Sequence, residues 1–256
     1  MTGHPLVDGG DHEDATRLAA EAARLLLAVR RELDRPGADP AAVGREGDRR
    51  SHELLAAALA ARHPDDAVVS EEAPPTPGAP GSGRTWVVDP LDGTREFAET
   101  GSTDWAVHVA LVVEGQPVAG AVALPARDLV LSTVPAPPPP PPGGEVLRLL
   151  VSRSRPPAFV APLAAALGAE VIPMGSAGAK AMAVVLGEAD AYVHAGGQHE
   201  WDSAAPVAVA VAAGLHTSRL DGSPLVYGTP GAWLPDLVVC RPEVAGPLLA
   251  ALEASL

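Results

Sequence analysis

Ten residues near the middle of the chain, PAPPPPPPGG at positions 135–144, restrict the possible folds more than any other stretch. Proline lacks an amide hydrogen and has a fixed φ, so this run can form neither a helix nor a central strand. We interpret it as an exposed polyproline connector without a recognition role. The sequence therefore predicts two lobes, 1–134 and 148–256, with the connector at 135–147 between them.

Charge and composition narrow the class of partner. The chain has 256 residues, 47% of them hydrophobic, and a formal net charge of −14. That charge argues against a nucleic-acid polymer, which needs a basic surface, but a small anion could still bind where metal ions or helix N-termini supply positive charge. No apolar stretch reaches roughly 18 residues, so no membrane span is expected. The start of the chain lacks a signal-peptide layout, which favours a cytoplasmic location.

The first lobe is predicted to contain two helices followed by a mostly antiparallel sheet. Apolar residues recur at helical spacing in both helical segments, and two β-rich runs separated by EGQP predict a hairpin. The expected elements are helices at 11–33 and 48–62, strands at 67–70 and 86–89, a Pro- and Gly-rich loop at 74–83, a hairpin of 105–113 with 118–124, and a further strand at 129–134.

The second lobe is predicted to alternate strands with helices, as α/β folds do. Gly187 and Gly214 stand where a C′ glycine would end a helix. The only cysteine, Cys240, lies in an apolar run and is expected to be a small buried side chain. The expected elements are strands at 148–152, 170–173, 191–194 and 237–240, helices at 157–167, 177–186 and 203–213, and a short terminal helix.

Acidic residues occur where strands end and helices begin. Glu71 and Glu72 follow one predicted strand, and Asp89 and Asp92 end another in WVVDPLDGTREF. Asp202 is expected to N-cap the helix that follows it. Such positions gather at one edge of an α/β sheet, where ligands bind. Taken singly, each of these residues is more often a cap or a surface charge than a ligand.

Together these carboxylates need a positive partner, because convergence would otherwise force some of them to take up protons. No basic cluster lies near them in the sequence. A hard divalent cation suits oxygen ligands, so Mg²⁺ is the expected partner. Pro90 would hold the Leu91 carbonyl toward that metal, and the amides of Gly93 and Thr94, at a helix start, could bind phosphate.

The ordered pattern of these motifs resembles the lithium-sensitive, Mg²⁺-dependent phosphatases of the inositol monophosphatase superfamily. The matching pieces are Asp48, the Glu71–Glu72 pair, DPLDGT at 89–94, and WDSAA beginning at Trp201. The resemblance implies a layered αβαβα sandwich in which metal ions activate a water molecule that attacks phosphate directly.

The resemblance also implies roles for individual residues. Two or three Mg²⁺ ions would be held by Glu71, Asp89, Asp92, Asp202 and the Leu91 carbonyl. Thr94 would orient the attacking water, and the Gly93 and Thr94 amides would bind phosphate. Asp48 and Glu72 would act behind the ligands or at a more weakly held metal. Asp48 departs from the family pattern, because GREGD lacks the threonine that usually precedes this aspartate.

Three further segments resemble the CysQ-type 3′(2′),5′-bisphosphate nucleotidases: VSRSRPP at 151–157, GSAGAKAMAV at 175–184 and LDGSPLVYG at 220–228. The resemblance implies hydrolysis of 3′-phosphoadenosine 5′-phosphate (PAP) to AMP and phosphate. Ser152, Arg153, Ser176 and Lys180 would contact the substrate. Arg153, Arg155 or Lys180 could pair with the second phosphate. Ordinary surface charge for the arginines, and a helix position with its charge in water for Lys180, are equally open.

Other functional interpretations of the sequence compete with the nucleotidase. Haloacid-dehalogenase-type phosphatases use Asp-x-Asp-Gly-Thr with a nucleophilic first aspartate, but Asp89 and Asp92 are one residue too far apart. His108, His194 and His199 are too dispersed to suggest zinc, and we interpret them as solvated or core histidines. Inositol monophosphatase or fructose-1,6-bisphosphatase activity is the main alternative, followed by a phosphate sensor without turnover. A homodimer is compatible with every reading.

Overall fold

The computed structural model describes residues 6–79, 82–229 and 231–255. Two sheets and seven α-helices are present in this part of the chain. In chain order the elements are α1 (Gly9–Arg30), η1 (Arg31–Asp34), α2 (Pro40–Arg62), β1 (Ala67–Ser70), β2 (Ala73–Thr76), β3 (Arg84–Asp92), α3 (Thr94–Ala98), β4 (Ala106–Val113), β5 (Gln116–Leu124), η2 (Pro125–Arg127), β6 (Leu129–Ser132), β7 (Arg148–Ser152), α4 (Val160–Leu167), β8 (Glu170–Met174), α5 (Ala177–Val185), β9 (Ala191–Ala195), η3 (Glu200–Asp202), α6 (Ala204–Ala212), β10 (His216–Ser218), β11 (Asp236–Cys240) and α7 (Pro242–Glu253).

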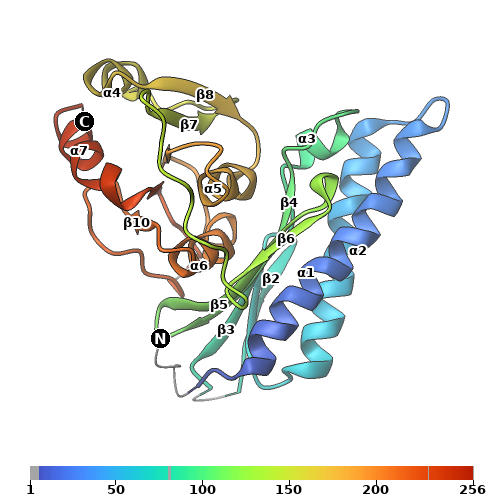
Figure 1. The fold of residues 1–256 in the computed structure, drawn as a ribbon. Helices are drawn as coiled ribbons and strands as arrows, with labels where there is room; N and C mark the ends of the chain where they lie inside the picture. Colours follow the sequence, from blue (N-terminus) through green and yellow to red (C-terminus); the bar gives the residue numbers. More distant parts are fainter. Residues whose placement is uncertain (1–5, 80–81, 230, 256) are drawn as a thin grey trace.

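The elements stack as five layers (Figure 1). Helices α1 and α2 cover one face of a six-stranded sheet ordered β2-β1-β3-β4-β5-β6, and α5 and α6 cover its other face. A five-stranded sheet, ordered β10-β11-β9-β7-β8, packs on α5, with α4 and α7 on its outer side. This is the αβαβα sandwich that the sequence resemblance implies.

Alternation along β3 explains why the first sheet needs helices on both faces. Trp86 and Val88 are buried in the core under α1 and α2, whereas Val87 between them is buried in the core shared with α5 and α6. Successive strand residues point to opposite faces, so a strand without polar alternation is buried on both sides. The apolar run before Asp89 therefore ends between the two helical layers.

The second helix begins at Pro40, and the predicted start at Asp48 is wrong by about two turns. The Asp39 side chain accepts a hydrogen bond from the Ala41 amide, and Pro40 occupies the first helical position, which is a strong start signal. Gly44 and Gly47, which weaken helical propensity, lie inside this helix. They let it approach α3, since a Cβ at Gly47 would come within 3.0 Å of the Phe97 ring.

Two strands escaped prediction. β2 overlaps the start of the segment 74–83, which was expected to be only a loop and of which residues 80–81 are outside the described residues. Pro74 and Pro75 are tolerated there because β2 is the edge strand of its sheet. β10 is a three-residue edge strand that pairs with β11, too short to show an alternating pattern. The other predicted strands and helices are present with ends shifted by a few residues at most.

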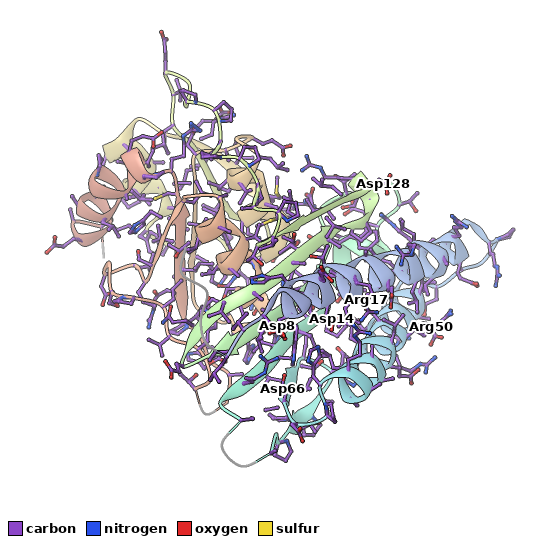
Figure 2. All side chains as sticks on the ribbon, turned by 60° about the horizontal axis from the view of Figure 1, so that its bottom comes forward. Asp8, Asp14, Arg17, Arg50, Asp66 and Asp128 are labelled. Carbon is purple, nitrogen blue, oxygen red and sulfur yellow. The ribbon has the colours of Figure 1, made fainter. Side chains whose placement is uncertain are left out.

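Charged side chains tie the start of α1 to the first sheet. Arg84, at the start of β3, lies 2.7 Å from Asp11 and 2.9 Å from Asp66, measured between nitrogen and oxygen atoms. Arg62 pairs with Asp14 at 2.7 Å. Figure 2 shows Asp14 on α1 and Asp66 on the segment beyond α2. The network joins the two outer helices to β3 on the face away from the second sheet.

The proline connector runs over the second lobe. The Arg241 guanidinium donates to the carbonyl of Pro141, and a Cβ added at Gly187 would come within 2.8 Å of the Pro141 ring. Arg241 itself is buried. None of the helices in the described ranges is long and apolar enough to span a membrane.

Candidate functional site

Strand β3 delivers the two aspartates of the DPLD segment. The ladder between β3 and β4 pairs Asp89 with His108 and then Asp92 with Ala106, so the register shifts between them. Pro90 and Leu91 fill this bulge, and the Pro90 carbonyl accepts a 2.7 Å hydrogen bond from the buried Ser51 hydroxyl of α2. A bulge re-aims side chains locally. Both carboxylates are buried as a result.

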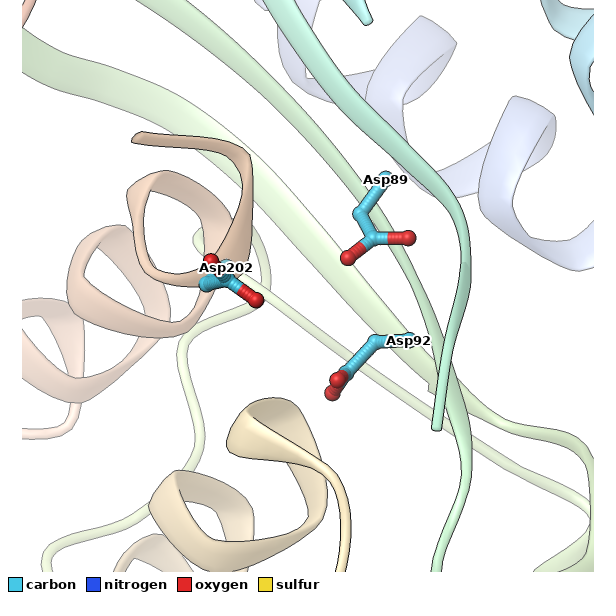
Figure 3. Close-up of side chains that lie close together, drawn as sticks. All are labelled: Asp89, Asp92 and Asp202. Carbon is cyan, nitrogen blue, oxygen red and sulfur yellow. The ribbon is translucent and has the colours of Figure 1, made fainter. Parts of the chain in front are cut away.

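Asp202 comes from the other side of the site, in the short 3₁₀ turn η3 before α6. The prediction that it N-caps α6 is wrong: its carboxylate accepts a 2.7 Å hydrogen bond from the backbone amide of His199, three residues earlier. Ser203 occupies the N-cap position instead, without a side-chain cap bond. The Asp202 side chain is thereby turned away from the helix and toward β3 (Figure 3).

The three aspartates meet across the gap between β3 and η3 (Figure 3). Asp89, Asp92 and Asp202 each offer a carboxylate oxygen within 4.8 Å of the others. They lie in the wall of a cavity of about 640 Å³. The same cavity is lined by four more residues predicted for the metal and phosphate positions: Glu71, Leu91, Gly93 and Thr94.

Gly93 allows the backbone of this wall to pack closely against the backbone at Asp104. Its φ is +86°, and a Cβ there would lie 2.9 Å from the Asp104 carbonyl oxygen. Only glycine adopts such a conformation at little cost and leaves room for that carbonyl. Gly93 thus ends the DPLD segment and starts α3 in a single residue.

Burial and mutual repulsion raise the pKa values of three of these carboxylates, those of Glu71, Asp89 and Asp202. Burial, followed by the charges of Asp92, Glu71 and Asp202, raises the pKa of Asp89 well above its ordinary value. Desolvation and the Asp202 carboxylate raise the pKa of Glu71 to about 7, and burial with Asp92 raises that of Asp202 to about 6. Oxygen donors held this close, at a cost in ionisation, fit a hard divalent cation.

Asp92 behaves in the opposite way. Its carboxylate accepts hydrogen bonds from the amides of Ala177 at 3.1 Å and Gly178 at 2.7 Å, and from the Ser176 hydroxyl. These donors form the N-terminus of α5, which favours negative charge. Burial alone would raise the pKa of Asp92, but His108, the Ser176 hydroxyl and the Lys180 charge outweigh it, and the pKa is lowered. Asp92 stays ionised next to partners that resist ionisation.

His108, on β4, places a basic ring next to the carboxylates. Of the two expectations for this residue, a solvated or a core histidine, the structure shows the second, since the ring is fully buried. His108 Nδ1 is 2.9 Å from the Trp201 carbonyl oxygen, and Nε2 is 3.3 Å from Asp92 Oδ2. Burial lowers its pKa, yet these acceptors outweigh that effect and the pKa is raised. The antiparallel register, which places His108 opposite Asp89, was the available signal.

Thr94, which lines the cavity, pairs with Asp48, which is not part of the lining. The Thr94 hydroxyl is 3.4 Å from Asp48 Oδ1 and 3.3 Å from the Leu91 carbonyl oxygen. Burial and the charges of Glu72 and Glu71 raise the pKa of Asp48 to about 7. Glu72 is exposed and does not line this cavity. It lines a neighbouring cavity, to which Glu71 also contributes.

Three of the four residues expected to contact the substrate line the cavity, and the fourth does not. Ser152, Ser176 and Lys180 line the cavity, together with Arg155. Arg153 is absent from the lining and pairs with Asp104 at the surface instead.

The idea that the Lys180 charge reaches water is wrong. Lys180 is 4% exposed, its Nζ lies 3.2 Å from the Gly175 carbonyl oxygen and also contacts the Ser176 carbonyl, and it sits over the Tyr192 ring. Burial lowers the pKa of Lys180 to about 8.

The profile of the inositol monophosphatase family matches residues 13–136 and 145–254, which is most of the chain. The chain belongs to this family. The family assignment made from the sequence motifs is therefore confirmed, and so is the phosphatase fold that it implies.

Two groups of curated relatives are similar over most of the chain. The 3′-phosphoadenosine 5′-phosphate phosphatase of Mycobacterium tuberculosis (strain CDC 1551 / Oshkosh) is 51% identical over 91% of this chain and 89% of its own length. The protein of the same name from Mycobacterium leprae (strain TN) is 48% identical over 93% and 92%. The 3′(2′),5′-bisphosphate nucleotidase CysQ of Escherichia coli (strain K12) is 32% identical over 69% and 76%.

Solved structures agree on the fold. Mycobacterium tuberculosis SuhB is 28% identical, with a TM-score of 0.73 over 95% of both chains. An inositol monophosphatase from Anabaena (Nostoc) sp. PCC 7120 is 20% identical, with a TM-score of 0.78 over 96% of both chains. The αβαβα sandwich predicted from the sequence is confirmed.

Proposed function

We propose that this chain is a Mg²⁺-dependent phosphatase that hydrolyses the 3′-phosphate of PAP to give AMP and phosphate. The observation that carries the proposal is the 48–51% identity to PAP phosphatases over more than nine tenths of the chain. The lining of the cavity contains both acidic residues and basic ones, Arg155 among them, which supports it. A substrate with two separate phosphates needs both.

The carboxylates of Glu71, Asp89, Asp92 and Asp202, with the Leu91 carbonyl, would hold the metal. Their oxygen atoms are the donors that Mg²⁺ prefers, and the raised pKa values of Glu71, Asp89 and Asp202 indicate negative charge that a cation would neutralise. Mg²⁺ bound there would lower the pKa of a water molecule and offset negative charge on the transferring phosphoryl group. The need for such a cation is consistent with the very acidic composition of the chain.

Gly93 and Thr94 in this wall, with Asp48 behind Thr94, would position the reacting groups. The Thr94 hydroxyl, between Asp48 Oδ1 and the Leu91 carbonyl, would orient the attacking water. Asp48 Oδ1 would accept the proton that the attacking water loses, because a carboxyl group whose pKa is near 7 exchanges protons readily at neutral pH. The amides of Gly93 and Thr94, where α3 begins, would hold phosphate oxygens.

A comparison of substrates tests the proposal. The value of kcat/KM would be measured with Mg²⁺ for PAP, inositol 1-phosphate and fructose 1,6-bisphosphate. We expect PAP to be preferred by about tenfold or more, which corresponds to about 1.4 kcal/mol in transition-state binding. A preference of that size for inositol 1-phosphate would replace the proposal with the alternative activity, and binding of PAP without phosphate release would indicate a sensor.

Inhibition gives an independent check. Li⁺ should inhibit at millimolar concentration by competing for one Mg²⁺ position, as the resemblance implies.

We propose that the enzyme works in the cytoplasm, where it acts on a small phosphorylated substrate linked to sulfur assimilation. Sedimentation of the purified chain would distinguish a homodimer from a monomer.

A further inference from the structure

Glu200 is a buried acidic residue to which the proposed reaction assigns no role. It lies in η3 two residues before Asp202, is 1% exposed and does not line the cavity of the candidate site, whereas Asp202 does. Successive residues of a 3₁₀ turn are rotated by about a third of a turn, so the two side chains leave η3 in different directions. A buried carboxylate outside the site needs hydrogen-bond partners of its own.

The partners of Glu200 come from the loop between β10 and β11. The Gly228 amide donates to Glu200 Oε2 at 2.9 Å, and the Thr229 amide and hydroxyl donate to Oε1 at 2.8 and 2.7 Å. Gly228 has a φ of +79°, and successive amides in a bend of this kind form a concave site for an anion. The carboxylate therefore fills an internal anion site made by residues 228 and 229.

Further contacts connect η3 to the same loop. The Glu200 amide donates to the Ala232 carbonyl oxygen at 2.7 Å. His199, which precedes η3, forms an antiparallel β-bridge with Trp233, and the centroids of their rings are 5.3 Å apart. The described residues of the segment 228–233 thus hold η3 through both its backbone and the Glu200 side chain.

Asp202 needs such a restraint, because a neighbouring carboxylate repels it. Burial, followed by the charge of Asp92, raises the pKa of Asp202 to about 6. Without metal, this repulsion acts to move η3 away from β3. His108 holds the turn from β4, with Nδ1 2.9 Å from the Trp201 carbonyl oxygen. The Glu200 carboxylate holds it from outside the cavity, through residues that do not belong to the lining.

We propose that Glu200 is a positioning residue, which fastens η3 to residues 228 and 229 and so keeps the Asp202 carboxylate in place before the metal binds. The inference rests on the proposed function and deepens it, because it concerns how one of the assigned metal ligands is held. Loss of a residue that supports a metal ligand typically weakens metal binding by roughly 10–100-fold. The effect should therefore appear in metal affinity and not only in stability.

The variant Glu200→Gln tests this role with almost the same side-chain shape. An amide has one acceptor oxygen, so its NH₂ group would face a backbone N–H of the loop. We expect Mg²⁺ to bind roughly 10–100-fold more weakly. Calorimetric titration of the metal-free protein measures this at a temperature at which circular dichroism shows parent and variant equally folded. Glu170→Gln, at an exposed position on β8, is the matched control and should bind Mg²⁺ as the parent does.

A purely structural role for Glu200 predicts a different result. Glu200→Gln would then melt at a lower temperature in EDTA, but the folded variant would bind Mg²⁺ with the parental dissociation constant, and this outcome would overturn the inference.

Two changes on the loop side provide rescue and a milder loss. Thr229→Ser keeps all three donors and should bind Mg²⁺ as the parent does, whereas Thr229→Val removes the hydroxyl and should bind it more weakly than Thr229→Ser. If Glu200→Gln does not fold, this pair decides the matter, and equal Mg²⁺ affinity of the two variants would refute the positioning role.

Hydrogen exchange reports on Asp202 directly, without metal or turnover. The His199 amide donates to the Asp202 carboxylate at 2.7 Å, so its exchange, followed by NMR in EDTA, should be faster in Glu200→Gln than in the parent. Unchanged protection of this amide would contradict the inference.

Failure of the inference and of the proposed function remain distinguishable. A parent that hydrolyses PAP with Mg²⁺, beside a Glu200→Gln variant of equal Mg²⁺ affinity, refutes only the inference. A parent that binds no Mg²⁺ and leaves PAP intact refutes both.

Discussion

Two aspartates three positions apart in the sequence have opposite ionisation behaviour. Asp92 is surrounded by donors from α5 and by His108, so its pKa is lowered, whereas the pKa of Asp89 is raised by burial and by its acidic neighbours. The sequence predicted that both would need a positive partner. It could not predict that Asp92 also accepts hydrogen bonds from the Ser176 hydroxyl and two helix amides, because residues 176–178 lie far along the chain.

The first prediction concerns Asp89→Asn. The change removes one negative ligand and should lower Mg²⁺-dependent kcat/KM by more than the roughly 10–100-fold typical of a supporting residue. Without metal, the variant should unfold at the same temperature as the parent or higher, because one source of repulsion is removed. Thermal unfolding in EDTA, beside rate measurements, checks both parts. Full activity, or a collapse of the fold, would contradict them.

Residues of the site that carry no motif were the hardest to foresee. His194 and Gln198 looked like ordinary members of AYVHAGGQHEWD, yet both buried residues line the cavity. Lys180 was expected at a phosphate, but its ammonium group contacts the carbonyls that precede α5. Such assignments follow from three-dimensional packing, which a single sequence does not specify.

At the level of elements, the N-terminus of α5 is seated against β3 and β4. A Cβ added at Gly178 would overlap the imidazole of His108, whose Nε2 is 3.3 Å from Asp92. The absence of a side chain at Gly178 therefore permits both the histidine and the helix amides to reach the same carboxylate. A substitution there tests the contact between elements without removing any polar group.

We predict that Gly178→Ala displaces His108 and lowers Mg²⁺ affinity and activity by roughly 10–100-fold, with a loss of stability of about 1–3 kcal/mol from overpacking. Gly246→Ala is the control, since Gly246 lies in α7 with open space around it, and it should gain about 0.4–1 kcal/mol. Calorimetric Mg²⁺ titration and urea unfolding measure the two effects. Equal behaviour of the two variants would show that α5 is not held in this way.

The link between the outer helices and β3 gives a third prediction. Arg84→Gln leaves Asp11 and Asp66 without their shared cation and should cost about 3–5 kcal/mol at pH 7, as when one partner of a buried pair is lost. Arg50→Gln, at an exposed position, should change stability by no more than about 0.5 kcal/mol. Urea unfolding of both variants provides the comparison.

The stability difference between Arg84→Gln and the parent should also depend on pH. Burial acts to raise the pKa of Asp11, but hydrogen bonds from Arg84 and the Asp8 amide outweigh it, and the pKa is lowered from 3.8. The stabilisation is therefore present above about pH 4 and is lost as pH falls through the lowered value. The gap between Arg84→Gln and the parent should narrow on acidification, and a gap that widens would contradict the network.

Element prediction succeeded where the local pattern was strong and failed where tertiary contacts decided. The hairpin of β4 and β5 and the alternation of the second lobe follow from their sequence periods. The start of α2 was missed because Gly44 and Gly47 weaken the helical pattern, although they are needed against α3. β2 was missed because prolines exclude a central strand but not an edge strand.

For the whole molecule, the layered architecture was predictable from the order of the motifs, but the geometry of the site was not. Asp89 and Asp92 come from the first sheet and Asp202 from the turn before α6, and their oxygens lie within 4.8 Å of one another. Bound metal would therefore join segments from both sides of the proline connector. Its binding energy would stabilise the folded state as a whole.

A fourth prediction follows for the metal-free protein. The pKa values of Asp48 and Glu71 are raised to about 7 and that of Asp202 to about 6. Between about pH 4 and pH 7 these groups bind more protons in the folded than in the unfolded state, so their contribution to stability falls as pH rises. In EDTA, the melting temperature should be lower at pH 8 than at pH 5.

Mg²⁺ should reverse this dependence. At a concentration of 100 times its dissociation constant, it should add about 2.7 kcal/mol at pH 8 and much less at pH 5, where protons compete for the carboxylates. Differential scanning calorimetry at both pH values, with Mg²⁺ and with EDTA, gives the four melting temperatures required. Asp89→Asn should show a smaller Mg²⁺ effect. A larger effect at pH 5 would contradict the assignment of these carboxylates to the metal.

The 110 positions that separate Asp92 from Asp202 have a consequence for how the protein is made. During synthesis on a ribosome, β3 and β4 emerge long before α5 and η3. Until then, the carboxylates of the first sheet lack the α5 amides and the third aspartate that surround them in the folded protein. A nascent chain that stops at the proline connector would hold acids but no site. Metal capture, and with it any reaction on phosphate, must therefore follow completion of the second lobe.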